Sequence, residues 1–409
     1  MNALSGDTYV FAEVDGKYGV YALKELFELH KQGRTIKVPA LLNERGEKTW
    51  VEVENVVSFG TQPLKRLVLV ASRLFVELSE DTIIPTFSPH LFSGTEEQIN
   101  LRFKPVNELQ IIQSRGIIWF KDQGENDTVL SAVRIPLFLP EGSQFEWEIG
   151  FTLGYFIAEG NLVYRKYKNT QRSLANLNWH AKQNGMTLEK YLSYRTDVQR
   201  VFLAVGRSDF ERGYVNVVKK HFKFGQPHKV SQNGYQLSST DLDLIYLIKF
   251  YIEGNDSYTK HIKNEVFNRS WKFLEGILDG YLAGDGYFDK KRDLFEIGLA
   301  TNYRLYNDLI FLSKALGYDT HLRKGQIAKS TSSNKLYYHL RLSIFKKWHR
   351  PTAIGLAREF IKSIEDIGKD EAYNLVLKPL YSETDKRSVF NHLFFTAYGF
   401  LVSDVVKVV

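Results

Sequence analysis

A nine-residue segment that occurs twice constrains the fold of this chain more than any other feature. The first copy, TLGYFIAEG, runs from Thr152 to Gly160, and the second, LDGYLAGDG, runs from Leu278 to Gly286. Both lie where apolar residues recur at the 3.6-residue period of a helix. Both end in an acid followed by glycine, which commonly ends helices by adopting the left-handed conformation. The repeat therefore predicts two similar helices that each finish at a carboxylate.

Small residues lie four positions apart along one face of each predicted helix. Gly154 and Ala158 share a face in the first copy, and Gly276, Gly280 and Gly284 share one in the second. Glycine inside a helix costs roughly 1 kcal/mol relative to alanine, so three on one face indicate that a close backbone contact compensates for the loss. The other copy has a matching face, and we predict that the two helices pack against each other.

Pairing the helices would bring their terminal acids, Glu159 and Asp285, together. Each acid would face the negative end of its helix dipole, which costs about 0.3–1 kcal/mol, and the two carboxylates would repel each other. A hard divalent cation such as Mg2+ binds carboxylate and water oxygens and would offset both effects. Beside a phosphodiester, such a site suits metal-assisted hydrolysis. A buried helix pair with merely solvated acids is the better interpretation of one isolated copy, but not of two.

Composition limits the class of protein and its chemistry. The chain has 409 residues, 44% of them hydrophobic and 25% charged, which is ordinary for two or three globular domains. With no cysteine it has no disulfide, no thiolate zinc site and no cysteine nucleophile. Its formal net charge of +7 mildly favours a polyanionic partner. Because the sequence has neither a signal peptide nor a stretch that could span a membrane, we expect a cytoplasmic protein with no membrane partner.

The period of the hydrophobic pattern divides the chain into regions. Residues 1–145 alternate apolar and polar residues in short runs typical of β-strands, apart from one helix predicted over 20–31. A helical period begins near residue 145, and strands return after 391, so we expect the C-terminus to complete the first domain. The predicted fold class is α+β. The longer helices are predicted over residues 147–159, 172–195, 269–284 and 303–316.

With these features the sequence resembles the LAGLIDADG homing endonucleases in their single-chain form, which carries two copies of the motif. The resemblance covers about residues 146–370, and the motif acids lie 285 − 159 = 126 residues apart, somewhat wide for the family. It implies a pseudo-twofold domain over 146–374, built from αββαββα-type repeats with the motif helices at the interface. Each half would supply an antiparallel sheet, and the two sheets would form a saddle in the DNA major groove. The implied activity is a site-specific double-strand cut in a long DNA site, made by a monomer with Mg2+ or Mn2+.

The resemblance also implies roles for individual residues. Glu159 and Asp285 would be catalytic acids, and the metal would lie at these acids and at the glycines that follow them, Gly160 and Gly286. Lys260 precedes the second motif, as does a lysine that contributes to the active site in the family, and it could stabilise charge on the phosphoryl group or transfer a proton. Ordinary surface charge is an equally good interpretation of Lys260. Basic residues near the predicted strands would contact DNA: Arg165, Lys166, Lys168, Lys324 and Arg341.

Residues 168–200 account for the extra length between the two motifs. Their pattern predicts two helices, one on each side of Gly185. This helical insertion could be an accessory DNA-binding hairpin. A plain surface insertion is the favoured interpretation, because one short segment is a weak basis for assigning a helix-turn-helix.

The flanking regions resemble inteins, self-splicing elements that often carry this type of endonuclease within their splicing domain. The segments that carry the resemblance are, in chain order, 3–10, 78–85, 103–109, 381–382 and 392–402. Together they imply an all-β splicing (Hint) domain made of residues 1–145 and 375–409 and interrupted by the endonuclease. Flanking segments of a host protein, the exteins, would be its partners.

The residues that splicing chemistry requires are replaced in this chain. Splicing needs a nucleophile at the first position, a histidine in the second segment, and a terminal His-Asn pair followed by another nucleophile. Here Ala3 and Thr82 stand at the first two positions, Ser403 and Asp404 stand at the pair, and a valine follows. His392 matches the histidine of the penultimate segment. The standard splicing route should therefore be closed, either because the ends were altered deliberately or, as four departures favour, because the splicing domain is naturally degenerate.

These observations lead us to expect an intein-type β domain that houses a metal-dependent homing endonuclease. One alternative is a self-splicing intein with a vestigial nuclease, against which Ala3 and Ser403 stand. The other is a DNA-binding module without catalysis, and the presence of both motif acids stands against that alternative.

Overall fold

A computed structural model of the chain describes residues 3–41, 48–69, 75–87, 101–109, 128–132, 137–164, 171–195, 198–299, 302–329, 336–345, 356–378, 394–397 and 400–403. Within these ranges the protein combines helices with antiparallel sheets, which confirms a mixed α and β composition. None of the helices in these ranges has both the length and the apolar character of a membrane span.

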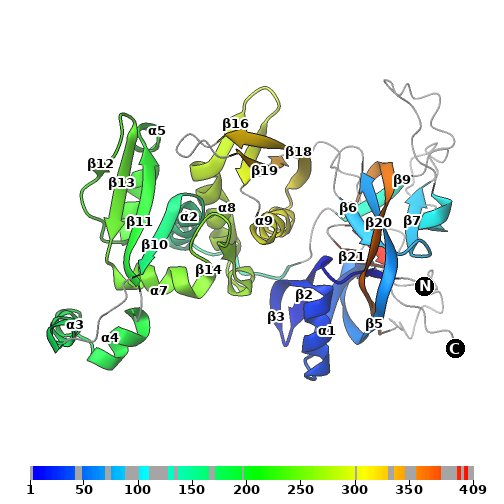
Figure 1. Ribbon diagram of the computed structural model, residues 1–409, viewed down its shortest axis with the longest axis horizontal. Helices are drawn as coiled ribbons and strands as arrows, with labels where there is room; N and C mark the ends of the chain where they lie inside the picture. Colours follow the sequence, from blue (N-terminus) through cyan, green and yellow to red (C-terminus); the bar gives the residue numbers. More distant parts are fainter. Residues whose placement is uncertain are drawn as a thin grey trace.

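One large antiparallel sheet lies at the right of Figure 1 and contains strands from both ends of the chain. Its strands are β1 (Leu4–Ser5), β2 (Tyr9–Val14), β3 (Lys17–Ala22), β4 (Ile36–Leu41), β5 (Lys48–Leu69), β6 (Phe75–Leu78), β7 (Ile83–Phe87), β8 (Leu101–Pro105), β9 (Thr128–Ala132), β20 (Leu356–Leu377), β21 (Phe394–Ala397) and β22 (Phe400–Ser403). Their order is β20-β1-β6-β5-β4-β2-β21-β22-β9-β7-β8, with β3 paired to β2. Strands before residue 133 and after residue 355 thus build one sheet.

Helix α1 (Leu23–Lys31) packs on this sheet, and β5 and β20 form its longest ribbon. Leu23 and Leu26 of the helix are buried against apolar strand residues such as Val10 and Leu67, which form one continuous core. The alternating pattern of the first 87 residues therefore predicts this region correctly, because one face of each short strand meets the core and the other meets water.

Strand β20 begins well before the domain boundary that the sequence predicts at residue 375. Its sequence lacks the two-residue alternation typical of a strand, because Ile361, Ile364 and Ile367 recur every three residues. The register of β20 against β5 shifts at several places, the first between Ile361 and Ser363. Each irregularity changes which face the following side chains occupy, so no regular two-residue period survives in the sequence. The part of the chain that pairs with the large sheet begins again at Leu356.

Two helices, α2 (Gln144–Glu159) and α8 (Trp271–Asp285), pack together in the middle of Figure 1, and each leads directly into a four-stranded antiparallel sheet. The strands of the first sheet are β10 (Gly160–Tyr164), β11 (Val198–Gly206), β12 (His228–Lys229) and β13 (Gly234–Ser239). Those of the second are β16 (Gly286–Asp289), β17 (Leu294–Leu299), β18 (Asp319–Lys329) and β19 (Leu336–Phe345). The orders β10-β11-β13-β12 and β16-β17-β19-β18 are the same topology.

Side-chain caps explain where the paired helices begin. The Ser143 hydroxyl accepts the Glu146 N–H at 3.3 Å while the Glu146 carboxylate accepts the Ser143 N–H at 3.1 Å, so α2 starts at a capping box. At the start of α8 the Ser270 hydroxyl accepts the Phe273 N–H at 3.2 Å. Both helices were predicted from the sequence, and the structure confirms them to within a few residues.

The remaining elements connect these parts. They are the helices α3 (Gln171–Gln183), α4 (Leu188–Arg195), α5 (Arg207–Glu211), α6 (Tyr214–His221), α7 (Leu242–Tyr251) and α9 (Tyr303–Ala315), the 3-10 helices η2 (Val106–Glu108) and η4 (Asn264–Asn268), and the short strands β14 (Ile252–Glu253) and β15 (His261–Ile262). Helix α7 escaped prediction because its sequence, LDLIYLIKFY, is apolar almost throughout and so shows no 3.6-residue period.

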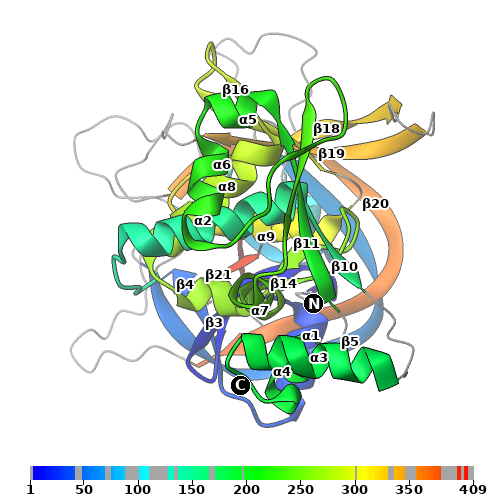
Figure 2. The ribbon, with the colours of Figure 1, turned by 90° about the vertical axis from the view of Figure 1, so that its left-hand side faces the viewer.

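The insertion forms two helices around Gly185, as its sequence predicts. Helices α3 and α4 share a small core of Leu177, Ala181 and Tyr191, which Leu242 of α7 completes. Figure 1 shows this pair at the lower left, away from the large sheet, and Figure 2 shows it next to α7. Whether the pair contacts DNA stays a prediction.

The large sheet and the helical region meet along the free edge of β3. The N–H of Tyr18 donates to Asn268 at 2.8 Å, and the N–H of Val20 donates to Asn264 at 2.9 Å. The Arg304 guanidinium donates to the Val20 carbonyl at 3.0 Å. Backbone groups at a sheet edge need partners, and here side chains of η4 and α9 supply them.

Candidate active site at the paired helix ends

Helices α2 and α8 touch backbone to backbone along their glycine faces. A Cβ atom on Gly154 would lie within 3.0 Å of the Ile277 carbonyl oxygen, and one on Gly280 would lie equally close to that of Phe151. Real Cβ atoms do not approach oxygen so closely, so these positions accept only glycine. This finding confirms the helix pairing predicted from the glycine spacing.

Contacts across the helix pair repeat with an offset of 126 residues, which is also the separation of the motif acids. Gly150 faces Phe273, and Gly276 faces Trp147. The two glycines lie 276 − 150 = 126 residues apart, and so do the two aromatic residues, 273 − 147 = 126. A contact that recurs with its partners exchanged is the signature of a twofold axis, so the helices pack with pseudo-twofold symmetry. Gly150 was not predicted at the interface, although it lies four residues before Gly154 and so carried the same spacing signal.

The glycines that end the two helices do not adopt the left-handed conformation, and that prediction is wrong. Gly160 has φ −96° and ψ 156°, and Gly286 has φ −91° and ψ 136°, which is extended backbone. A Cβ on Gly160 would lie within 3.0 Å of the Phe156 carbonyl oxygen, and one on Gly286 would lie that close to the carbonyl of Leu282. Glycine is needed because the chain passes straight from helix into strand. Each motif acid therefore sits where a helix joins the sheet of its own half.

The two motif acids lie in an unfavourable electrostatic environment. Glu159 is partly buried, and this burial, with the charges of Asp285 and Asp209, raises the pKa of its carboxyl to about 7. Loss of hydration against the surrounding protein raises the pKa of Asp285 to about 6, against the charge of Lys260 and the hydrogen bond from Tyr281, although the residue is exposed on one side. Ordinary carboxyl groups titrate near pH 4, so the charge of the neighbouring Lys260, which lowers both pKa values, does not offset what raises them. Such perturbed groups mark candidate functional sites.

Lys260 supplies a buried ammonium group to the same place. Its residue is 2% exposed, and its Nζ donates to the Gly160 carbonyl at 2.7 Å and to the Phe156 carbonyl at 3.3 Å. Burial lowers the pKa of Lys260 to about 8, while the charges of Asp285 and Glu159 act in the opposite direction. Interpretation of Lys260 as ordinary surface charge is therefore excluded. Its ammonium contacts the first half of the helix pair although it precedes the second in sequence.

Two tyrosines at equivalent positions, one turn before the acids, make different hydrogen bonds. The hydroxyl of Tyr155 donates to Asp209 at 2.9 Å, whereas that of Tyr281 donates to Asp285 itself. Asp209, from α5, is thus a third carboxylate close enough to affect Glu159. The sequence repeat contains the signal for both tyrosines, because each is the fourth residue of its copy. Nothing in the sequence indicates that Asp209 lies here.

The donor set at the helix ends fits a hard divalent cation. Among the described residues no three or more His, Asp or Glu side chains converge as a metal-binding group, so Glu159 and Asp285 would share a cation with backbone carbonyls and water. The Gly160 carbonyl accepts from Lys260 but has a second lone pair. The two carboxyls end helices that touch backbone to backbone, and this closeness of two acids favours a cation; oxygen ligands suit Mg2+ or Mn2+.

Several predicted site residues have no described side chain. Those outside the described residues are Arg165, Lys166, Lys168, His392 and Asp404. For Lys324, Arg341 and Ser403 the backbone alone is described. Lys324 lies where the register of β18 against β19 shifts, Arg341 lies in the middle of β19, and Ser403 ends β22. Their roles stay predictions.

The structure places Ala3 directly against Thr82, which the sequence assigned to the first and second splicing segments. Ala3 is fully buried, and its N–H donates to the hydroxyls of Ser79 at 3.1 Å and Thr82 at 3.2 Å. The Thr82 hydroxyl donates in turn to the Ala3 carbonyl at 3.1 Å. The two segments therefore lie side by side, with neutral groups that satisfy one another.

Comparison with known proteins gives weak similarity to solved structures. No protein-family model matches the chain, and no curated protein matches it at a significant level. A variant of the Ssp DnaB mini-intein is similar over 99% of this chain and 100% of its own, at 8% identity and a TM-score of 0.30. A variant of the endonuclease I-DmoI, in complex with its target DNA and in the presence of Mn, is similar over 49% of this chain and 88% of its own, at 14% identity and a TM-score of 0.27.

A further solved structure is the I-SmaMI LAGLIDADG homing endonuclease bound to cleaved DNA. It is similar over 49% of this chain and 79% of its own, at 14% identity and a TM-score of 0.23. At TM-scores this low, none of these likenesses adds to the geometry of the helix ends.

Proposed function

We propose that this protein is a site-specific DNA endonuclease of the two-motif LAGLIDADG type, which makes a metal-dependent double-strand cut. The observation that carries the proposal is the convergence of Glu159, Asp285 and the buried Lys260 at one end of a pseudo-twofold helix pair. A DNA duplex also presents two strands related by twofold symmetry, and proteins that bind such sites commonly match that symmetry. An enzyme that cuts both strands needs one acid for each strand, and each half of the helix pair supplies one.

The roles we propose follow from where each group is held. Glu159 and Asp285, with the carbonyls of Gly160 and Gly286, would hold Mg2+ or Mn2+, which activates water and polarises a phosphodiester when bound. Each acid is fixed to its own sheet because the strand begins at the next residue. Lys260 stands close enough to both acids for their charges to interact, and it would stabilise negative charge that develops on the phosphoryl oxygens.

We propose that the two four-stranded sheets form the DNA-binding surface. Beside Asp285, strand β16 presents Tyr287 at 67% exposure, and the exposed Tyr258 lies two residues before Lys260. Aromatic side chains of this kind can stack on bases. The basic residues proposed to contact DNA are Arg165, Lys166, Lys168, Lys324 and Arg341.

We further propose that the large sheet belongs to an intein-type β domain that no longer splices. This domain would comprise residues 3–132 and 356–403, with the endonuclease domain between them, and any exteins would flank it. Both hydroxyls at Ala3 accept its N–H, so neither is placed to protonate that nitrogen, and alanine offers no nucleophile. The protein would act as a cytoplasmic monomer.

The closed splice site is tested by mass spectrometry. After incubation with dithiothreitol or hydroxylamine, which release a thioester or ester at an active splice junction, the mass of the purified chain should not change. Loss of a terminal segment would show instead that splicing chemistry persists, as in a self-splicing intein with a vestigial nuclease.

The endonuclease function is tested by cleavage of a DNA library that contains randomised sites and candidate host genes. With Mg2+ or Mn2+, the protein should cut a defined site, and Glu159→Gln and Asp285→Asn should both abolish cutting. Asp279→Asn is the matched control, because it removes an acid from the same helix but retains the acceptor for Trp147. Sequence-specific binding without metal-dependent cutting would favour a DNA-binding module and contradict the proposal.

A further inference from the structure

The loop that carries Lys260, residues 254–260, joins β14 to β15 and contains neither helix nor strand. A lysine on a loop acts reproducibly only when the loop itself is held in place. Gly254 has φ +80°, and a Cβ there would lie within 3.0 Å of the Thr259 carbonyl carbon. The two ends of the loop therefore approach each other closely, and only glycine permits that approach.

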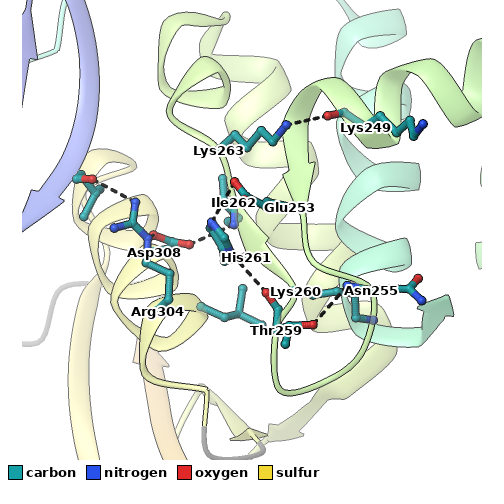
Figure 3. Close-up of polar contacts among 12 residues, drawn as sticks. Lys249, Glu253, Asn255, Thr259, Lys260, His261, Ile262, Lys263, Arg304 and Asp308 are labelled. Carbon is teal, nitrogen blue, oxygen red and sulfur yellow. Dashed lines mark hydrogen bonds and ion pairs between the residues drawn. The ribbon is translucent and has the colours of Figure 1, made fainter. Parts of the chain in front are cut away.

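Asp256 folds the loop into a closed turn. Its carboxylate accepts the N–H of Tyr258 at 3.0 Å and the N–H and hydroxyl of Thr259 at 2.9 and 2.8 Å. Its carbonyl accepts the N–H of Lys260 at 2.9 Å. Figure 3 shows this turn beside Lys260, with Asn255 and Thr259 joined by a hydrogen bond. The conformation of the loop is therefore fixed internally, but these contacts do not fix its position relative to the helix ends.

Two asparagines fix that position: Asn255, in the loop, reaches the first half of the helical region, and Asn302, in the second half, reaches the loop. The side-chain oxygen of Asn255 accepts the N–H of Leu162 at 2.7 Å, on the strand that follows Glu159. The side-chain nitrogen of Asn302 donates to the Lys260 carbonyl at 2.7 Å and to the Ser257 carbonyl at 3.2 Å. Asn302 is 4% exposed, and its oxygen accepts the Leu305 N–H at 3.1 Å, so the same side chain also caps α9.

We propose that Asn302, together with Asn255, is a positioning residue of the active site that holds the Lys260 ammonium at the Gly160 carbonyl, near the two motif acids. This inference rests on the proposed endonuclease function. Asn302 holds the backbone of Lys260 to the second half, while the Lys260 ammonium contacts the Gly160 carbonyl of the first. A shift of the loop would move the ammonium away from the acids, and displacements of about 1 Å in an active site can cost about 100-fold in rate.

The decisive variant is Asn302→Ser. Serine is as good an N-cap as asparagine, so α9 keeps its cap, but it does not reach the Lys260 carbonyl. The melting temperature should fall only slightly, because the carbonyls of Ser257 and Lys260 lose one donor, and the affinity for the selected target DNA, measured without divalent metal, should match the wild type. The single-turnover cleavage rate constant in Mg2+, measured well below the melting temperature, should fall about 10- to 100-fold. A loss of rate in protein that is fully folded and binds DNA normally is a result that general destabilisation does not produce.

Substitutions at Asn255 supply a second test and a rescue, and a substitution at Asn268 supplies the control. Asn255→Ala removes the acceptor for Leu162 and should repeat the loss of rate, whereas Asn255→Asp keeps the acceptor and should cleave close to the wild-type rate. Asn268→Ser loses comparable amide contacts, but to β3, and should cleave like the wild type. Wild-type rates in Asn302→Ser and Asn255→Ala would overturn the positioning role alone. A wild-type protein that cuts no DNA would overturn the proposed function instead.

Discussion

The surroundings of Ala3 and the ends of the paired helices both bring segments from distant parts of the chain together, but they differ in charge. Around Ala3, a backbone amide and two hydroxyls are neutral and supply one another with donors and acceptors. At the helix ends, two carboxylates and a buried ammonium stand together, and both carboxyls have raised pKa values. The first arrangement contributes to stability, whereas the second costs stability unless something else binds.

That difference supports the place we propose for the chemistry. Buried polar groups in a structural region are paired with one another, because an unpaired group loses its hydration without compensation. Functional sites depart from this rule, and the rest of the fold offsets the cost. The helix ends are such a departure, which supports the proposal that catalysis takes place there and that the surroundings of Ala3 are structural.

Disruption of the helix pair should give the largest effect. Gly280→Ala would place a Cβ within 3.0 Å of the Phe151 carbonyl oxygen and separate the helices. The free energy of unfolding measured in urea should fall by about 3 kcal/mol or more, despite the better helix propensity of alanine. Gly225→Ala is the control, since the nearest atom to its Cβ would be the Ser238 carbonyl oxygen at 3.6 Å. Equal stability of Gly280→Ala and the wild type would contradict close helix packing.

Removal of the buried charge should leave a folded but slow enzyme. Lys260→Met keeps the length of the side chain but removes the ammonium, so the cleavage rate constant should fall about 100-fold. Lys263→Met is the matched control, because the Lys263 ammonium donates to a different backbone carbonyl, that of Lys249, at 2.7 Å (Figure 3). If both variants cleave equally well, Lys260 has no part in the reaction.

The pH dependence of stability sharpens the contrast in charge. Because the folded protein raises the pKa of Glu159 from 4.5 to about 7, it binds more protons than the unfolded chain between these values. The free energy of unfolding of the metal-free protein should therefore fall as pH rises through this window. Glu159→Gln should show a shallower slope, and Mg2+ should raise the melting temperature of the wild type only. Identical slopes for the two proteins would show that the fold does not raise the pKa of the Glu159 carboxyl.

The smallest effect is expected at the neutral site. Thr82→Val removes a hydroxyl that bonds to both the N–H and the carbonyl of Ala3, which should cost about 1 kcal/mol of stability. The DNA cleavage rate should not change, because this hydroxyl lies just before strand β7 of the large sheet and not at the helix ends. Reduced cleavage in Thr82→Val at unchanged stability would mean that the two regions are coupled.

Local patterns allowed much of this molecule to be predicted from its sequence. The helix pair follows from glycines four residues apart and from acids at matching ends, features that depend only on neighbours along the chain. The pairing of the Ala3 and Thr82 segments is non-local, and only the resemblance to inteins brought them together.

Other features depend on contacts that no local pattern records. The ammonium of Lys260 is bound by the carbonyl of Gly160, 100 residues earlier in the chain. Its backbone carbonyl is bound by Asn302, 42 residues later. Strand β20 was missed because register shifts remove its alternation. The extended conformation of Gly160 was missed because glycine is compatible with several ways of ending a helix.

The most direct measurement is the rate of double-strand cleavage of the selected target DNA in Mg2+ by the wild type and by Asp285→Asn. We predict that the wild type linearises the DNA, that chelation of the metal stops the reaction, and that Asp285→Asn binds the same DNA but does not linearise it. Cleavage that survives either the substitution or the chelator, or binding by a wild type that never cuts, would contradict catalysis at the helix ends.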